Sequence, residues 1–246
     1  MSFSALAPLA DRAALFVALR QDAFLTALGG NAGHEWHADM AAGTITFTAS
    51  HEAAEPMVAR AHLIATLAPG PRSLLWAWAH PQGGNASVST ALRDYSVSTA
   101  LRDYGTEHDV TALMQPELPF PNDTGDDLDA WVSQTAVAVA GTAIEITGRA
   151  PYFSAPIEGG TRAVFLLDTP LPPLTVEDAG RALPRLLSEL SLSDARTSVW
   201  DLARLASWNL QWRDDNFSGA VVSDATGTVT FDFDEHARIV SITPAN

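Results

Sequence analysis

The sequence predicts an α+β fold in which helices pack against antiparallel sheet meanders. Segments with apolar residues at three- and four-residue steps indicate helices, and short runs rich in β-branched and aromatic residues lie between them. Adjacent runs are joined by short turns instead of crossover helices, which favours antiparallel pairing. The length of 246 residues corresponds to one large domain or two modest ones.

The first part of the chain is expected to hold one long helix and four strands. Apolar periodicity from Leu9 onward predicts the helix and Gly29-Gly30 ends it, although Arg20 intrudes on the apolar face. The expected elements are a helix at 9–28, a hairpin at 35–48 with its turn at 41–43, and strands at 57–67 and 74–79. Both faces of the last strand are apolar, so we expect it to be central and covered on both sides.

A nine-residue segment occurs twice in direct succession, at 87–95 and 96–104. At ~100° per residue, nine residues advance an α-helix by about two and a half turns, so equivalent apolar residues of the two copies face opposite sides. One straight helix over 87–104 therefore cannot bury both copies against one core. Either the two halves are buried on opposite sides, or one copy is extra and packs on something else.

The second part of the chain is expected to alternate helices and strands after an acidic, proline-containing loop. The expected elements are a loop at 116–129, a helix at 126–140, strands at 143–150 and 162–167, helices at 175–190 and 193–206, and strands at 208–212, 221–224, 228–233 and 238–242. Thr175 is the expected N-cap of the first C-terminal helix, with Asp178 in the capping-box position. Pro184 is expected to kink or restart that helix.

Three prolines at positions 170, 172 and 173 mark the best domain boundary. We therefore expect an N-terminal α+β domain over 1–169 and a C-terminal helix-helix-strand unit over 170–246. The second unit either completes the sheet of the first or stands apart.

The composition excludes several classes of function. The chain has 29 Asp and Glu, 14 Arg, no Lys and no Cys, for a formal charge of −15. Phosphate-binding and Schiff-base lysines, disulfides, thiol nucleophiles and Cys-ligated metals are therefore absent. The negative charge repels nucleic acids and anionic membranes, so neither is an expected partner. The N-terminus lacks the pattern of a signal peptide, and no apolar run reaches the ~18 residues of a membrane span, so we expect a soluble cytoplasmic protein without a cofactor.

The negative charge is concentrated in two segments. Residues 103–148 contain nine acids and no Arg, and residues 214–237 contain six acids and no Arg. The rest of the chain has 14 acids against 14 Arg and is neutral. A surface formed by these segments is where we expect a cationic partner or a metal ion.

Three motifs contain potential metal ligands. His34 and His37 are three apart on an expected strand, so they point to opposite faces and do not form a zincin helix. The acids of 122–129 lack the spacing of an EF-hand loop and are explained by capping of the next helix. Asp232 and Asp234 alternate with two Phe along a strand, so they are either a cation site or the solvated face of a half-buried sheet.

Trp76 and Trp78 share one face of the expected strand at 74–79, with His80 after it. The pair is either part of the core, which is the commoner role of Trp beside apolar neighbours, or a platform for a ligand. In the second case Asp39 or Asp232 would act as acid or base beside a pocket formed by Trp76, Trp78 and His80. No nucleophile elbow and no dinucleotide fingerprint are present.

The succession Trp36-His-Ala-Asp39, Gly43-Thr-Ile-Thr-Phe47, an apolar strand at 63–67 and Leu75-Trp-Ala-Trp-Ala-His-Pro81 resembles the bacterial domain-of-unknown-function family 6882. The resemblance covers roughly residues 9–168, and its most specific part is the Trp-Ala-Trp-Ala run. His80 stands where the family pattern has Asn, and the duplication lengthens the helix after this run. The resemblance implies a fold and no reaction.

These observations predict a non-catalytic cytoplasmic protein. It would act through protein–protein interaction, either with another protein or with further copies of itself, using its acidic surfaces or the duplicated helix 87–104. The alternative is a small-molecule-binding protein or hydrolase whose pocket lies beside Trp76, Trp78 and His80.

Overall fold

The computed structural model describes residues 3–30, 34–39, 41–49, 55–80 and 95–245. It divides into two compact units. Unit 1 comprises the chain up to Ala10 together with Phe24–Pro170, and unit 2 comprises Asp11–Ala23 together with Leu171–Asn246. The long first helix, α1 (Ala7–Ala27), thus contributes its two ends to unit 1 and its middle to unit 2. The helices and antiparallel sheets of both units confirm the predicted α+β class.

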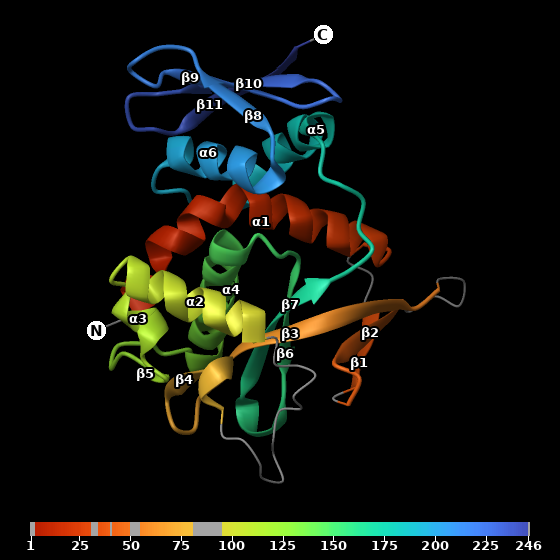
Figure 1. Cartoon of the computed structure of the whole chain (residues 1–246), viewed down its shortest axis with the longest axis vertical. Coiled ribbons are helices and arrows are strands. Elements are labelled where there is room, and N and C mark those ends of the chain that lie inside the picture. Colours follow the sequence, from red (N-terminus) through yellow and green to blue (C-terminus); the bar gives the residue numbers. More distant parts are fainter. Residues whose placement is uncertain (1–2, 31–33, 40, 50–54, 81–94, 246) are drawn as a thin grey trace. The chain divides into compact units, whose positions relative to one another are not determined.

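Unit 1 is built around one seven-stranded antiparallel sheet (Figure 1). Its strands are β1 (His34–Asp39), β2 (Thr44–Ala49), β3 (Met57–Ala68), β4 (Ser73–Trp76), β5 (Glu117–Pro119), β6 (Tyr152–Pro156) and β7 (Arg162–Asp168). The long strand β3 organises the sheet, because it pairs with β2 through its first residues, with β4 through its last residues and with β7 along most of its length. The predicted hairpin at 35–48 is confirmed as β1 and β2.

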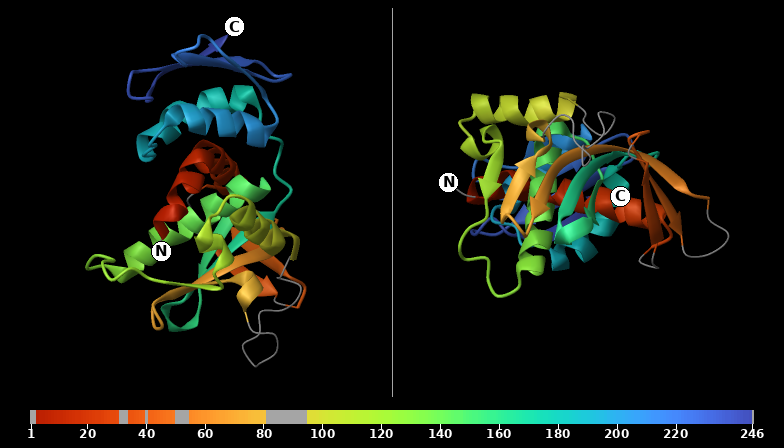
Figure 2. Two further views of the ribbon diagram at one scale, coloured as in Figure 1. Left: turned by 60° about the vertical axis from the view of Figure 1, so that its left-hand side comes forward. Right: turned by 90° about the horizontal axis from the view of Figure 1, so that it is seen from below.

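The helices of unit 1 are the ends of α1, α2 (Tyr95–Glu107), α3 (Thr111–Met114) and α4 (Leu128–Thr147). Helix α2 lies beside both α3 and α4 (Figure 1), and Figure 2 gives two further views of these helices. The backbones of α1 and α4 approach closely because α4 carries Gly141, where an added Cβ atom would lie 3.2 Å from Cα of Ala10. Thr142 strengthens this contact by donating a hydrogen bond to the carbonyl of Leu6 over 3.2 Å. The largest fully buried side chains of this core include Trp76, Phe24 and Phe47.

The expected break between a helix at 126–140 and a strand at 143–150 is wrong. Helix α4 continues to Thr147 and ends at Gly148, which adopts the left-handed conformation that favours glycine at a helix C-terminus. The β-branched run that suggested a strand lies inside the helix, where Ala143 and Ile144 are completely buried. Burial on several sides of the helix therefore outweighs the local β-propensity.

The expected strand at 74–79 is also wrong in its second half. Strand β4 ends at Trp76, and Ala77–Ala79 form a turn of 3-10 helix, η2. Trp76 and Trp78 therefore do not share a strand face. Strands β5 and β6 were not predicted, since their prolines favoured loops in both segments.

The second copy of the duplicated segment forms most of α2, and its Val97 and Leu101 are buried at 2% and 1% exposure. The first copy lies, except for Tyr95, outside the described residues. The second copy thus packs on the core of unit 1.

Unit 2 contains the middle of α1, two helices and a four-stranded antiparallel meander in the order β11-β10-β9-β8. Its elements are α5 (Val176–Leu186), α6 (Ala195–Ala206), β8 (Asn209–Trp212), β9 (Gly219–Ser223), β10 (Thr228–Phe233) and β11 (Ile239–Ala245). Helices α5 and α6 lie on one face of this sheet (Figure 2). Along β10 the buried residues alternate with half-buried ones, as predicted for a half-buried strand.

Polar contacts of α1 explain why charged residues interrupt its apolar pattern. Arg20 donates to the carbonyl of Pro172 over 2.9 Å, and Asp22 forms an ion pair of 2.7 Å with Arg185. Partial burial lowers the pKa of Arg20. These contacts lie within unit 2, where the middle of α1 meets the segments after Pro170. Pro184 does not restart α5 but lies in its last turn, and a 3-10 turn at Leu187–Glu189 follows.

Candidate functional site

A connected polar cluster of unit 1 joins His62, Arg149 and Asp168. Nε2 of His62 lies 2.8 Å from Oδ2 of Asp168, and Nη1 of Arg149 lies 3.1 and 3.2 Å from the two oxygens of the same carboxylate. Nη1 of Arg149 is also 3.2 Å from Nε2 of His62. The imidazole is 1% exposed, whereas the carboxylate is 47% and the guanidinium 36% exposed. The cluster therefore combines a buried imidazole with a carboxylate and a guanidinium that are both accessible to solvent.

Three elements bring these side chains together. His62 lies in β3 and Asp168 at the end of β7, and these strands pair so that His62 opposes Leu166 and Arg60 opposes Asp168. Arg149 follows the last turn of α4. Directly opposed residues of an antiparallel pair lie on the same face of a sheet, so Arg60 and His62 share the face of Asp168.

Arg60 and Tyr152 extend this face. Arg60 is exposed, and its side chain forms no hydrogen bond or ion pair with any part of the chain that the structure describes. Tyr152 opposes Leu166 from β6, and burial raises the pKa of its hydroxyl. Asp168 is paired with Arg149, and the guanidinium of Arg60 has no ion-pair partner among the described residues. This face of the sheet could therefore hold an anionic group at the guanidinium of Arg60.

The three residues predicted to form a pocket, Trp76, Trp78 and His80, each contact a different part of unit 1. Trp76 is completely buried, and its indole N–H donates to the carbonyl of Ala112 over 2.9 Å, so it belongs to the core. Trp78 is half-buried, with the guanidinium of Arg102 5.3 Å from its ring centroid. His80 pairs its Nε2 with the hydroxyl of Thr66 at 3.1 Å.

The acids predicted as catalytic or metal-binding groups take part in local contacts. Asp39 accepts hydrogen bonds from the backbone N–H groups of Ala41 and Ala42, which closes the turn between β1 and β2. Asp232 pairs with Arg213 and also accepts from the hydroxyl of Ser241 at 2.6 Å. Asp234 accepts from two backbone N–H groups of its own turn and from Arg238. Throughout the described residues, no three His, Asp or Glu side chains are grouped so as to hold a metal ion.

Other acids of the C-terminal meander likewise hold turns. The hydroxyl and backbone N–H of Ser218 hydrogen-bond to Asp214 and lower the pKa of its carboxyl. Partial burial would raise the pKa of Asp224, but hydrogen bonds from the hydroxyl of Thr226 and from nearby backbone N–H groups lower it. The hydrogen bonds of Arg238 lower the pKa of Asp234 to about 2.

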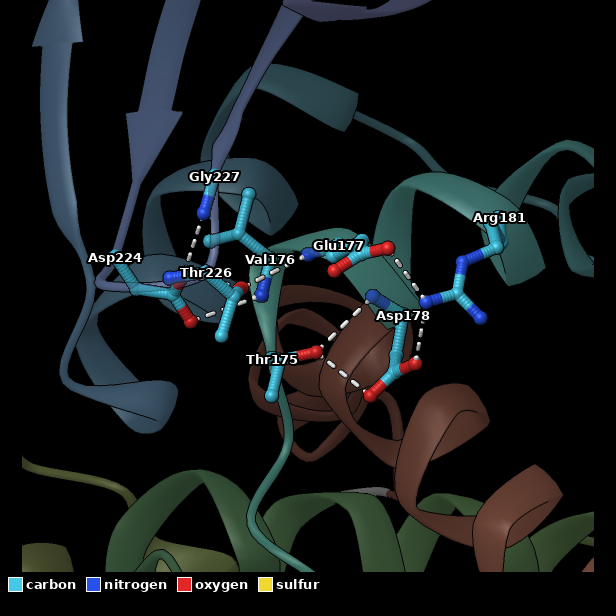
Figure 3. A network of polar contacts seen from close by, with 8 residues as sticks. All are labelled: Thr175, Val176, Glu177, Asp178, Arg181, Asp224, Thr226 and Gly227. Atoms are coloured by element: carbon cyan, nitrogen blue, oxygen red, sulfur yellow. Dashed lines mark hydrogen bonds and ion pairs between the residues drawn. The ribbon is translucent and has the colours of Figure 1, made fainter. Parts of the chain in front are cut away.

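Figure 3 shows how Asp224 connects the β9–β10 turn to the start of α5. One oxygen of Asp224 accepts from the backbone N–H of Val176 over 3.0 Å, while the other closes its own turn through Thr226 and Gly227. Thr175 accepts from the backbone N–H of Asp178 at 3.1 Å, which confirms it as the N-cap. This acidic network is explained by the architecture of unit 2.

The acids between Asp103 and Asp129 behave differently, and we call this stretch the acidic segment. It contributes exposed carboxylates from α2, the α2–α3 turn, β5, the following loop and the first turn of α4: Asp103, Glu107, Asp109, Glu117, Asp123, Asp126, Asp127 and Asp129. Two of them cap turns, since Asp123 accepts from Gly125 and Asp127 from Ala130. None forms an ion pair within the described chain, and the segment itself contains no Arg.

The cluster of His62, Arg149 and Asp168 was not predicted, because Arg149 is 87 residues from His62 and 19 from Asp168. No local spacing links them. The one available signal was the position of each: a His inside a strongly apolar strand, an Arg directly after a helix and an Asp at a strand end.

Unit 1 is an α+β domain that presents a connected polar cluster and an acidic surface. The model of the family of unknown function DUF6882 matches residues 7–170, and the chain belongs to that family. The match confirms the resemblance seen in the tryptophan run and leaves residues 171–246 outside it. No curated protein and no solved structure matches the chain.

In the part of the chain that is described, no helix has both the length and the apolar character needed to cross a membrane.

Proposed function

We propose that this protein acts by binding a cationic protein partner through its acidic segment. The observation that carries the proposal is a contrast between the two acid-rich stretches. Asp214, Asp224, Asp232 and Asp234 are engaged in turns, caps and ion pairs of unit 2. The acidic segment instead directs eight carboxylates to solvent without an ion pair to any Arg of the described chain.

Unpaired surface charge of one sign is suited to association. It steers an oppositely charged partner during encounter and disfavours partners of like charge. At physiological ionic strength each charge acts over about 8 Å, so neighbouring carboxylates of α2 and its following turn reinforce one another. Asp103, Glu107 and Asp109 are three such neighbours. A partner that places several Arg or Lys against them would gain specificity from charge and additional affinity from direct hydrogen bonds.

The test compares two variants that change the net charge equally. The first removes four charges of the acidic segment, by Asp103→Asn, Glu107→Gln, Asp109→Asn and Glu117→Gln. The matched control removes four exposed charges elsewhere, by Glu35→Gln, Glu55→Gln, Glu158→Gln and Glu189→Gln. The probe is a fluorescent arginine-rich peptide, followed by anisotropy at low and physiological salt.

We expect the first variant to bind the peptide on the order of 10-fold more weakly than the control variant, because only the first removes charges that would face the partner. Its salt dependence should also be smaller. Equal losses in the two variants would show that only net charge matters, and the proposal for the acidic segment would then be wrong.

A second candidate function is favoured by Arg60. Its guanidinium has no ion-pair partner among the described residues and lies on the sheet face of Asp168, whose carboxylate Arg149 contacts. A small ligand with a carboxylate or phosphate group would therefore find two guanidinium groups near one another. Titration calorimetry with inorganic phosphate and with citrate tests this site. Arg60→Gln should abolish any binding, while Arg181→Gln, a change at an exposed arginine of unit 2, should leave it unchanged.

A further inference from the structure

Helix α2 is anchored by three residues spaced four apart on one face. Val97 and Leu101 are almost completely buried, and Gly105 continues the same stripe. Because the segment at 87–95 is identical to that at 96–104, Val88 and Leu92 could fill the same positions with the same shapes. The copies differ only in their flanks, and the residue that directly follows is Ser96 after the first copy and Gly105 after the second.

That following residue lies at the closest contact of the helix. A Cβ atom at position 105 would lie 2.8 Å from Cβ of Leu113, 3.1 Å from the carbonyl oxygen of Val110 and 3.2 Å from Cγ of Met114. Real Cβ atoms essentially never approach another heavy atom within 3.0 Å. Leu113 is completely buried in α3, and its Cβ is fixed to the backbone, so it cannot move aside as the end of a flexible side chain would.

We propose that Gly105 determines which of the two identical segments forms α2. Packing of the first copy would place Ser96 against Leu113 and Val110, where its Cβ has no room. Packing of the second copy places Gly105 there. The contact with α3 thus selects between two stretches that propensity, burial and side-chain shape cannot distinguish, and it leaves the first copy outside this packing position.

The experiment disrupts each copy at the same place. Leu101→Asp places a charge in the buried position and should lower the midpoint of thermal unfolding by on the order of 10 °C. Leu92→Asp makes the identical change in the first copy and should shift the midpoint by no more than about 2 °C. Circular dichroism on the full chain measures both.

The decisive variant adds Ser96→Gly to Leu101→Asp. The first copy then ends in glycine as the second does, so it can replace the damaged copy, and we expect more than half of the lost midpoint to return. A nine-residue lengthening of the connection to α3 costs little, because loop entropy grows slowly with length. Ser96→Gly alone is the control for a general effect of glycine.

Deletion of residues 87–95 tests whether the first copy contributes to the packing, because it leaves one copy followed by Gly105. We expect this deletion variant to unfold at the same temperature as the full chain. The proposal is overturned if Leu92→Asp is as damaging as Leu101→Asp. It is also overturned if Ser96→Gly fails to rescue Leu101→Asp, or if the deletion variant unfolds at a clearly lower temperature than the full chain.

Discussion

Nε2 of His62 lies 2.8 Å from Oδ2 of Asp168, across 106 residues of sequence. The contact links a completely buried imidazole in β3 to a half-exposed carboxylate at the end of β7. Arg149, which follows the last turn of α4, forms an ion pair with the same carboxylate. The three side chains therefore connect the end of this helix to the sheet.

Replacing Asp168 by Ala should destabilise the protein by about 1 to 3 kcal/mol, because the buried His62 would lose its carboxylate partner. Asp168→Asn should cost less, since its amide oxygen can still accept a hydrogen bond. Urea denaturation measures both variants. Glu158→Ala, a change at an exposed acid in the β6–β7 turn, is the control and should be within about 0.5 kcal/mol of the wild type. An Asp168→Ala variant as stable as the control would mean that the contact contributes nothing.

The two tryptophans of the Trp-Ala-Trp-Ala run should respond differently to replacement by Phe. Trp76→Phe removes buried volume and leaves the carbonyl of Ala112 without its donor, so we expect a loss of about 2 to 3 kcal/mol. The indole N–H of Trp78 is buried but has no hydrogen-bond partner in the described chain. Its removal should therefore cost about 1 kcal/mol or less, mainly from the weaker contact with Arg102. Similar losses in denaturation experiments on the two variants would contradict this assignment.

Gly180 allows α5 to approach β10. A Cβ atom there would lie 2.8 Å from Cγ2 of Val229, which is buried. Gly180→Ala gains about 1 kcal/mol of helix propensity, but overpacking costs about 1 to 3 kcal/mol, so we expect a net loss of stability. Gly227→Ala is the matched control in the same unit, because a Cβ atom there meets open space. It should be neutral or slightly stabilising in thermal denaturation. A more stable Gly180→Ala variant would show that the helix can move away without cost.

The turns of unit 2 should make the stability of the protein depend on acidic pH. Hydrogen bonds from Ser218 lower the pKa of Asp214, and those from Arg238 lower the pKa of Asp234 to about 2. Since both values lie below the ~3.9 of an unfolded Asp, the stability that these groups add is complete above pH ~5 and is lost as the pH falls from ~4 toward 2. Urea denaturation at several pH values measures the slope. Asp234→Asn should flatten it, and an unchanged slope would exclude Asp234 as a contributor.

Local patterns predicted most elements of the fold correctly. The helix that begins near Leu9, the hairpin at 35–48 and the C-terminal meander each have a clear periodicity and a glycine, Asx or proline signal at their ends. The N-cap at Thr175 was predictable for the same reason, because capping depends on residues within one turn of helix.

The errors occurred where distant packing outweighed local preference. The run that ends α4 has β-branched residues, but it is helical because the surrounding core buries Ala143 and Ile144 on several sides. The cluster of His62, Arg149 and Asp168 was missed because strand register and a helix end, not spacing, bring it together. Charge counts likewise identified two acid-rich stretches. They did not show that the acids of the C-terminal meander form hydrogen bonds and ion pairs, whereas those of the acidic segment form no ion pair within the described chain.

The sequence by itself was sufficient to predict the α+β class, the positions of most helices and strands and the family. It also excluded lysine and cysteine chemistry. Each of these properties depends on residue types or on near neighbours in the chain. The folded chain was needed to establish which carboxylates are paired, which tryptophan is buried in the core and which of two identical segments forms α2. Those outcomes depend on contacts between residues that local patterns do not connect. The contact between Gly105 and Leu113 is the clearest case, since two segments with the same sequence can be distinguished only by what surrounds them.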